Sequence, residues 1–241
     1  GENEFIQRER ELDLDRNDKP SNIFVGSVIG GGSHLNPILE ICKILEGRGY
    51  KITLVAPGNF TAKSTLYHSI PQIITGELES RASPTYREVF FYKYTFKTLA
   101  TARMMSNKRY IENFNKYLQA YKETKPDLFI CDYVANEACF DLAWKFKQPI
   151  VGFSASTMIF TPPPPYRSDP IFDCHVSMEN ESFYNRFICA VVQPLRLSWQ
   201  FRKNINYLNS ERAKVGVSEH NDFRGRIINT LFLVDNFFGF E

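Results

Sequence analysis

The sequence lacks the cysteine spacings that are typical of disulfide frameworks and zinc sites. None of its five cysteines forms a CxxC pair or a zinc-type spacing with histidine, and their number is odd. We therefore expect buried thiols rather than a disulfide framework, and no metal site. The cysteines are Cys42, Cys131, Cys139, Cys174 and Cys189.

Long apolar runs and long basic runs are also missing. No apolar run reaches the roughly 20 residues of a membrane-spanning helix, and no secretory signal peptide is visible. The net charge is only +2 at pH 7, so a nucleic-acid partner has little electrostatic support. Asn59 and Asn180 begin glycosylation sequons, which leaves both a lumenal and a cytoplasmic location open.

The sequence does contain enough apolar residues for one large or two small α/β domains, since 43% of its 241 residues are hydrophobic. Residues 1–20 alternate charges and should form a flexible, exposed arm. From 21 to 241, apolar β-branched runs alternate with helical patterns, which predicts a Rossmann-like, mostly parallel sheet flanked by helices. The predicted strands are Ile23–Ile29, Ile52–Ala56, Ile70–Thr75, Leu128–Cys131, Pro149–Ser154 and Thr230–Val234.

The first predicted helix has clear start and stop signals. Asn36 is expected as its N-cap and Pro37 as its first residue, and two glycines, Gly47 and Gly49, should end it. Further helical patterns lie within 84–125, 136–146 and 183–204, the last interrupted by a proline. That aromatic-rich stretch fits a packed helix better than one lying against a membrane.

The turn between the first strand and the first helix carries three glycines followed by Ser33 and His34. In open α/β sheets such turns line the crevice where ligands bind. A dinucleotide site would need GxGxxG and an acidic residue after the second strand, but residues 54–58 end that strand without an acid. Nicotinamide binding is disfavoured, and His34, which can accept a proton near neutral pH, is the best catalytic candidate. The alternative is a surface histidine that only forms a hydrogen bond.

Asp132 strengthens the catalytic interpretation. It follows a short buried strand and precedes the helix expected from Asn136, so it should lie in the same crevice as His34. A carboxylate beside an imidazole fixes its tautomer and stabilises the imidazolium that forms when the ring takes a proton. The alternative is that Asp132 caps the following helix, a role that would not exclude the first.

Two parts of the chain resemble signatures of one enzyme family. Residues 32–41, GSHLNPILEI, and the following segment to Val55 are similar to the amino-terminal signature of the UDP-dependent glycosyltransferases that conjugate small molecules in plants, fungi and animals. The segment 126–132, PDLFICD, followed by 148–154, resembles the family's second signature. The final FFGFE resembles the segment that leads into the interdomain linker. The match spans nearly everything after Ser21.

The resemblance implies half of a two-domain GT-B fold. Members hold the acceptor mainly in the first domain and the nucleotide sugar in the second, whose donor-binding signature has no counterpart here. Residues 21–241 would then be the acceptor-binding domain of a UDP-glucosyl/glucuronosyltransferase-like enzyme, without its carboxy-terminal donor-binding domain. Such an enzyme moves a hexose from a UDP-sugar, for instance UDP-glucose, to a hydroxyl of a lipophilic or phenolic molecule, with inversion, and without a metal or cofactor.

The resemblance also assigns roles to residues. His34 would be the general base that deprotonates the acceptor, and Asp132 its orienting carboxylate. Ser33 and Ser154 match positions that touch the donor phosphates or sugar in relatives. The acceptor pocket would be walled by an aromatic and Met-rich insertion, whose members also suit core packing. The candidates are Phe90, Phe91, Tyr94, Met104 and Met105.

Two further expectations follow. Without the donor-binding domain, the chain should bind a small-molecule acceptor and transfer no sugar. Animal members are anchored in the endoplasmic reticulum by a carboxy-terminal span, so the resemblance is compatible with membrane association of a full-length protein. The alternative function is a non-catalytic α/β module that binds a lipophilic small ligand in the same crevice.

Overall fold

A computed structural model describes residues 21–29, 32–78, 96–154, 182–220 and 230–234. The charged arm 1–20 and three of the predicted pocket residues, Phe90, Phe91 and Tyr94, lie outside these ranges. Over the described ranges, no helix combines the length and apolar character needed to cross a bilayer.

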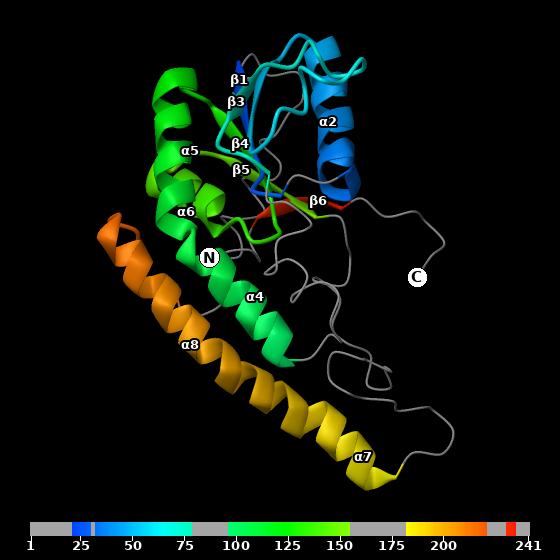
Figure 1. The fold of residues 1–241 in the computed structure, drawn as a ribbon, viewed down its shortest axis with the longest axis vertical. Coiled ribbons are helices and arrows are strands. Elements are labelled where there is room, and N and C mark those ends of the chain that lie inside the picture. Colours follow the sequence, from blue (N-terminus) through cyan, green and yellow to red (C-terminus); the bar gives the residue numbers. More distant parts are fainter. Residues whose placement is uncertain (1–20, 30–31, 79–95, 155–181, 221–229, 235–241) are drawn as a thin grey trace, which may run out of the picture.

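The described chain forms a parallel six-stranded sheet with helices on both faces (Figure 1). Its strand order is β3-β2-β1-β4-β5-β6, and every neighbouring pair is parallel. All six predicted strands are present and the predicted Rossmann-like class is confirmed. The strands are β1 (Asn22–Gly26), β2 (Lys51–Ala56), β3 (Gln72–Ile74), β4 (Leu128–Asp132), β5 (Ile150–Ser154) and β6 (Leu231–Val234).

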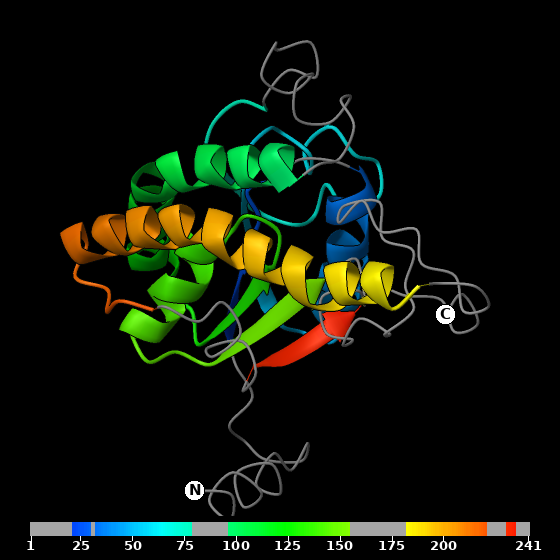
Figure 2. The same cartoon turned by 90° about the horizontal axis from the view of Figure 1, so that it is seen from below.

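The helices form a layer on each face of the sheet. The helix α2 covers one face, whereas α5 and α6 pack on the other (Figure 1). The long α8 runs beside α4 on the side of α5 and α6, and Figure 2 shows the two helices lying side by side. The bounds are α2 (Gly32–Gly47), α4 (Phe96–Lys108), α5 (Tyr110–Thr124), α6 (Glu137–Lys145), α7 (Phe183–Phe187), the π-helix η3 (Ile188–Val192) and α8 (Gln193–Lys214).

Strand alternation gives the sheet two apolar cores. Along β1, Ile23 and Val25 face α2, and Phe24 between them faces α5 and α6. In β4, Ile130 faces α2 and Phe129 faces the opposite core. Burial on both faces explains why these strands appear in the sequence as continuous apolar runs.

The expected start of the first helix was wrong. The helix begins at Gly32 rather than after Asn36, so Pro37 lies inside it and cannot donate a hydrogen bond to the carbonyl four residues earlier. The reason is burial. Leu35 is fully buried and shares its core with Ile38, at the i, i+3 spacing of one helix face. Packing of Leu35 therefore outweighed the local capping preference, whereas the predicted end at Gly47 is confirmed.

The expectation of five free thiols was also wrong. Cys131, in β4, and Cys139, in α6, form a disulfide, and Cys189 is disulfide-bonded as well. Seven residues separate Cys131 from Cys139, a spacing without a motif, so only the packing of α6 on β4 brings them together. Cys42 is the buried thiol that was expected, and burial raises its pKa to about 12. Cys174 lies outside the described residues.

Candidate functional site

The direction in which successive strands are added to the sheet reverses between β1 and β4. The chain adds β2 and β3 on one side of β1, then crosses to β4 and adds β5 and β6 on the other. In open α/β sheets, ligands bind outside the carboxyl ends of the two strands that flank such a switch point. A ligand-binding site is therefore expected at the segment that follows β1 and at the end of β4.

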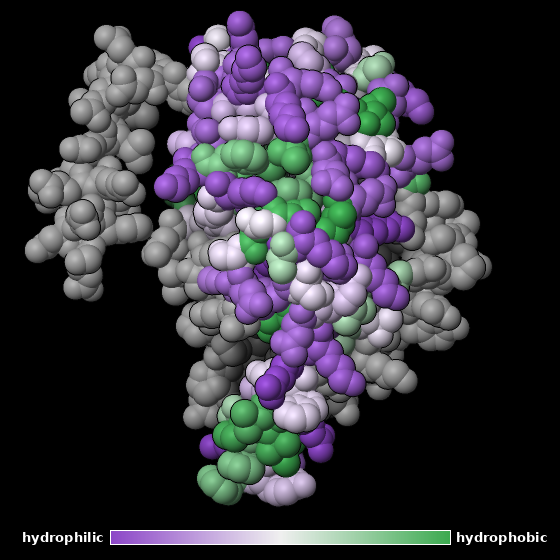
Figure 3. All heavy atoms as spheres, turned by 90° about the vertical axis from the view of Figure 1, so that its left-hand side faces the viewer, coloured by the Kyte–Doolittle hydropathy of each residue, from purple (hydrophilic) through white to green (hydrophobic). Residues whose placement is uncertain are grey.

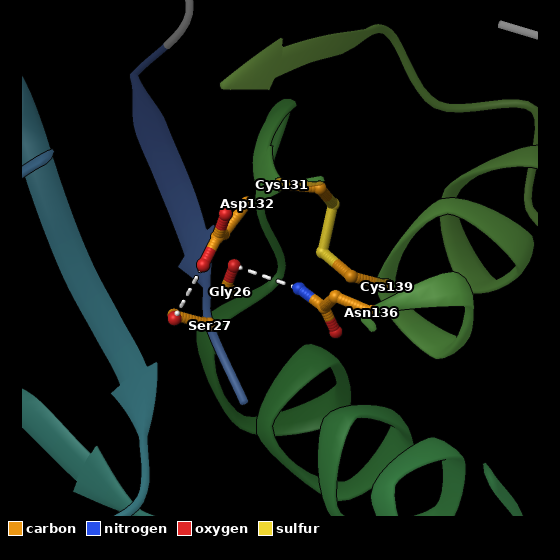
Figure 4. The surroundings of a disulfide bond; sticks show 6 residues. All are labelled: Gly26, Ser27, Cys131, Asp132, Asn136 and Cys139. Atoms are coloured by element: carbon orange, nitrogen blue, oxygen red, sulfur yellow. Dashed lines mark hydrogen bonds between the residues drawn. A yellow bond between two sulfur atoms is a disulfide. The ribbon is translucent and has the colours of Figure 1, made fainter. Parts of the chain in front are cut away.

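Two polar side chains meet at this switch point. Ser27 directly follows β1, Asp132 ends β4, and both are fully buried. The Ser27 Oγ lies 3.0 Å from Asp132 Oδ2 (Figure 4) and 3.0 Å from the carbonyl oxygen of Ile29. Its single proton goes preferentially to the carboxylate, since charged acceptors form the stronger hydrogen bond. Asp132 is thus held by a side chain from the neighbouring strand.

The pleat of β4 turns Asp132 toward α2. Residues 128, 130 and 132 alternate onto the face that α2 covers, and Leu128 and Ile130 pack in that core. The helix α2 starts at this edge and carries Ser33 and His34 in its first turn. The side chains of Ser33 and His34 lie outside the described part of the structure. Topology therefore places the two backbones at one edge, and the His34–Asp132 contact stays a prediction.

The second carboxylate oxygen is bound locally. The Val134 N–H donates to Asp132 Oδ1 over 3.3 Å. The N-cap of α6 is Asn136, not Asp132, and its side-chain amide donates to the Gly26 carbonyl over 2.9 Å (Figure 4). Asp132 thus braces its own turn and does not cap the following helix.

A buried phenol lies close to the carboxylate. Burial raises the pKa of Tyr117 well above its ordinary value, and the charge of Asp132 adds to the shift, while the side-chain amide of Asn136 opposes it. The phenol therefore stays protonated throughout the physiological range. It therefore adds no negative charge beside Asp132.

The helix α4 is fixed beside this edge by two contacts. Arg103 forms an ion pair with Glu137 in the first turn of α6. Ser106 Oγ donates to the Ala135 carbonyl over 3.2 Å, in the turn after Asp132. Met104 and Met105, which lie between Arg103 and Ser106 in α4, are half-buried. Both methionines are thus on an element that borders the candidate site, as a pocket wall would be.

Ser154 occupies the same edge but the opposite face. It ends β5 and is buried, and the alternation along β5 puts it on the side of α5 and α6. Asp132 pairs in register with Phe153, the residue before it. The backbone of Ser154 therefore lies near the end of β4, but its side chain does not lie on the α2 side of the sheet.

The sequence interpretation missed Ser27 and the Cys131–Cys139 disulfide. A small hydroxyl residue directly after an apolar strand was a usable signal for Ser27, because that position lies at the edge where open α/β sheets bind ligands. The disulfide left no local signal. Among the described residues, no group of three or more His, Cys, Asp or Glu side chains is arranged to hold a metal ion.

Comparison with known proteins adds information on the fold. No family model and no curated protein sequence matches the chain. Among solved structures, the calicheamicin glycosyltransferase CalG4 superposes with a TM-score of 0.56 at 16% identity, over 90% of this chain and 48% of that one. The glycotransferase of kitacinnamycin gives a TM-score of 0.53 at 16% identity, over 90% and 46%. The chain spans about half the length of each.

At this level of identity the likeness concerns the fold. The described sheet and its flanking helices match half of a GT-B glycosyltransferase. The GT-B architecture suggested by the sequence motifs is therefore supported by the three-dimensional structure.

Proposed function

We propose that this chain is the acceptor-binding and general-base domain of an inverting, UDP-sugar-dependent glycosyltransferase. The observation that carries the proposal is the buried Ser27–Asp132 hydrogen bond at the switch point, on the sheet face where α2 begins with Ser33 and His34. A carboxylate fixed by a neighbouring strand, beside a helix turn that carries an imidazole, suits an oriented general base.

In the proposed reaction, His34 takes the proton of an acceptor hydroxyl. The acceptor oxygen attacks the anomeric carbon of the sugar, the bond to the diphosphate breaks, and UDP leaves with the bonding electron pair. Attack opposite to the leaving group inverts the anomeric configuration. Asp132 stabilises the imidazolium that has formed, and neither a metal nor a covalent sugar intermediate is required.

The other predicted residues serve binding. Met104 and Met105 on α4 would wall the acceptor side together with Phe90, Phe91 and Tyr94, and apolar walls suit a lipophilic or phenolic molecule. Ser33 would add a hydrogen bond to the donor, whereas Ser154, also predicted to touch the donor, is buried on the other face of the sheet. One such bond contributes about 1 kcal/mol, which cannot offset the entropy of association, so the donor needs a second domain.

The test is turnover by the complete enzyme with UDP-glucose and the flat phenol 4-methylumbelliferone, followed as UDP release. His34→Ala should lower kcat by about a hundredfold to ten-thousandfold and leave acceptor binding largely intact. His68→Ala is the matched control, because His68 is exposed and its ring bonds only the Thr65 carbonyl in its own turn. Near-normal turnover of His34→Ala would mean that the base lies elsewhere.

Binding experiments on the 241-residue chain distinguish an enzyme domain from a non-catalytic ligand-binding module. Calorimetric titration should show weak binding of 4-methylumbelliferone and no measurable binding of UDP-glucose. Tight binding of UDP-glucose, or transfer by the chain alone, would show that the donor site has been misplaced. A complete protein that binds the phenol but never releases UDP would favour the non-catalytic module.

We also propose the lumenal location over the cytoplasmic one. Disulfides persist in oxidising compartments, and Cys131 pairs with Cys139. Asn59 is exposed, as a glycan would require. Deglycosylation of the protein from its native cells should lower its mass, and a protein of unchanged mass would favour the cytoplasm.

A further inference from the structure

The helical rod formed by α7, η3 and α8 exposes a row of apolar side chains. It projects away from the sheet, with α7 at its far end (Figure 1). Five residues spaced four apart, here termed the apolar row, are between 40% and 84% exposed. They are Phe183, Phe187, Val191, Leu195 and Trp199. Such a row on one helix face is the pattern of a docking surface rather than of scattered surface residues.

The π-helix narrows the angle over which the row spreads around the rod. In an α-helix of 3.6 residues per turn, a step of four residues turns about 400°, so a row spaced by four drifts around the helix. The i→i+5 bonds of η3 spread a turn over more residues, so that the same step there falls short of a full turn. The two drifts have opposite signs, so η3 reduces the total drift of the row between Phe183 and Trp199.

The opposite side of the rod is already packed. Asn204 in α8 donates through Nδ2 to the Ala100 carbonyl over 3.0 Å, and Asn107 in α4 donates to the Asn204 carbonyl over 3.1 Å. The expected packed helix is thus confirmed for one side of α8, while the apolar row points elsewhere. Figure 3 shows apolar side chains gathered at the lower tip of the molecule, over α7.

The charge along the rod has one sign. Arg196, Arg202 and Lys203 are exposed, and no acidic residue occurs between Ser182 and Ser210. The Arg202 guanidinium lies 5.9 Å from the centre of the Trp199 ring, at the end of the apolar row. A second copy of this surface would bring like charges together, which disfavours self-association. A layer of phosphate groups, by contrast, complements it.

We propose that this surface docks the protein on a lipid bilayer. The apolar row enters the interfacial region, where Phe and Trp side chains are favoured, and the Arg and Lys side chains bind lipid phosphates. The rod would lie flat on the membrane and hold the sheet beside a bilayer in which lipophilic molecules concentrate. This inference goes beyond the proposed function and would stand if the transfer reaction were disproved.

Flotation of the 241-residue chain with vesicles tests the apolar row. We expect binding to phosphatidylcholine vesicles that contain one fifth phosphatidylinositol. The pair Leu195→Ser and Trp199→Ser should lower the partition coefficient tenfold or more. The matched control is Ile44→Ser with Leu66→Ser, because both side chains are comparably exposed but lie far from the rod in sequence, and its partitioning should equal that of the unchanged chain.

Charge reversal tests whether the Arg and Lys side chains of the rod bind lipid phosphates. Arg196→Glu with Lys203→Glu should weaken vesicle binding severalfold, and 0.5 M NaCl should abolish the difference from the unchanged chain. The control pair Lys63→Glu with Lys122→Glu changes the net charge equally at two exposed positions outside the rod and should bind as before.

Tryptophan fluorescence tests whether Trp199 contacts the bilayer. The chain has two tryptophans, so Trp144→Phe leaves Trp199 as the single reporter. Its emission should shift to shorter wavelength with vesicles, and brominated lipids should quench it. Absence of vesicle binding, or equal losses in the row variants and their controls, would overturn the proposal. A dimer in sedimentation velocity that Leu195→Ser with Trp199→Ser dissociates would overturn it as well, by showing that a second copy covers the row.

Discussion

Ser27 and Asp132 form a buried hydrogen bond between the ends of two neighbouring strands, with 3.0 Å between Oγ and Oδ2. Ser27→Ala should therefore leave Asp132 less firmly held and lower kcat of the complete enzyme about tenfold, equivalent to about 1.4 kcal/mol. Steady-state kinetics check this. Ser210→Ala is the control, because Ser210 is exposed and bonds only the Tyr207 carbonyl of its own helix. Unchanged kcat with lowered stability would show that Ser27 has only a structural role.

The Cys131–Cys139 disulfide should stabilise the site region. It closes a loop across eight residues, and replacing both cysteines by serine should cost about 2.5 kcal/mol through the entropy of the unfolded chain. Urea unfolding measures this as a lower midpoint with a similar slope. Equal midpoints for the two proteins would show that the packing of α6 on β4 suffices without the bond.

The helix α8 is tied to α6 by a buried ion pair. Arg212 Nε donates to Asp141 Oδ2 over 2.6 Å, and Tyr110 Oη donates to the same oxygen over 2.8 Å. Arg212→Met should cost about 3–5 kcal/mol, because it leaves the Asp141 charge buried with its main partner removed. Thermal or urea unfolding checks the loss.

An exposed ion pair offers the matched control for Arg212. Lys116 pairs with Glu112 on the surface of α5, and their side chains are 35% and 61% exposed, so Lys116→Met should leave the unfolding midpoint nearly unchanged. Similar losses of stability in the two variants would show that the buried pair contributes no more than an exposed one.

Six strands could be predicted from the sequence because β-branched apolar runs are a strong local signal, and burial on both faces made those runs continuous. Asp132 was found because it follows such a run. The start of α2 was missed because it depends on burial of Leu35 against the sheet, and capping residues carry no information on such long-range packing. The Cys131–Cys139 pair depends on the same kind of long-range packing. Local chemistry thus predicted the elements, and tertiary contacts decided their ends and cross-links.

The contact between β5 and β6 depends on a glycine. A Cβ on Gly152 would overlap the Phe232 ring, which itself stacks on Phe140 with 6.0 Å between ring centres. Gly152→Ala should therefore cost about 1–3 kcal/mol through overpacking. Gly47→Ala is the control, since nothing lies within 4 Å of its added Cβ. Differential scanning calorimetry compares the two, and equal melting temperatures would contradict the close approach.

We propose that Asp132 acts through His34. A double-mutant cycle on kcat of the complete enzyme, with UDP-glucose and 4-methylumbelliferone as substrates, measures the coupling between the two residues. If Asp132 only orients and stabilises the imidazole, Asp132→Asn should slow the enzyme strongly by itself but add almost nothing once His34 is alanine. The double variant should then turn over as slowly as His34→Ala alone. Losses that multiply, with each substitution lowering kcat by the same factor whether or not the other is present, would show that Asp132 acts independently of His34.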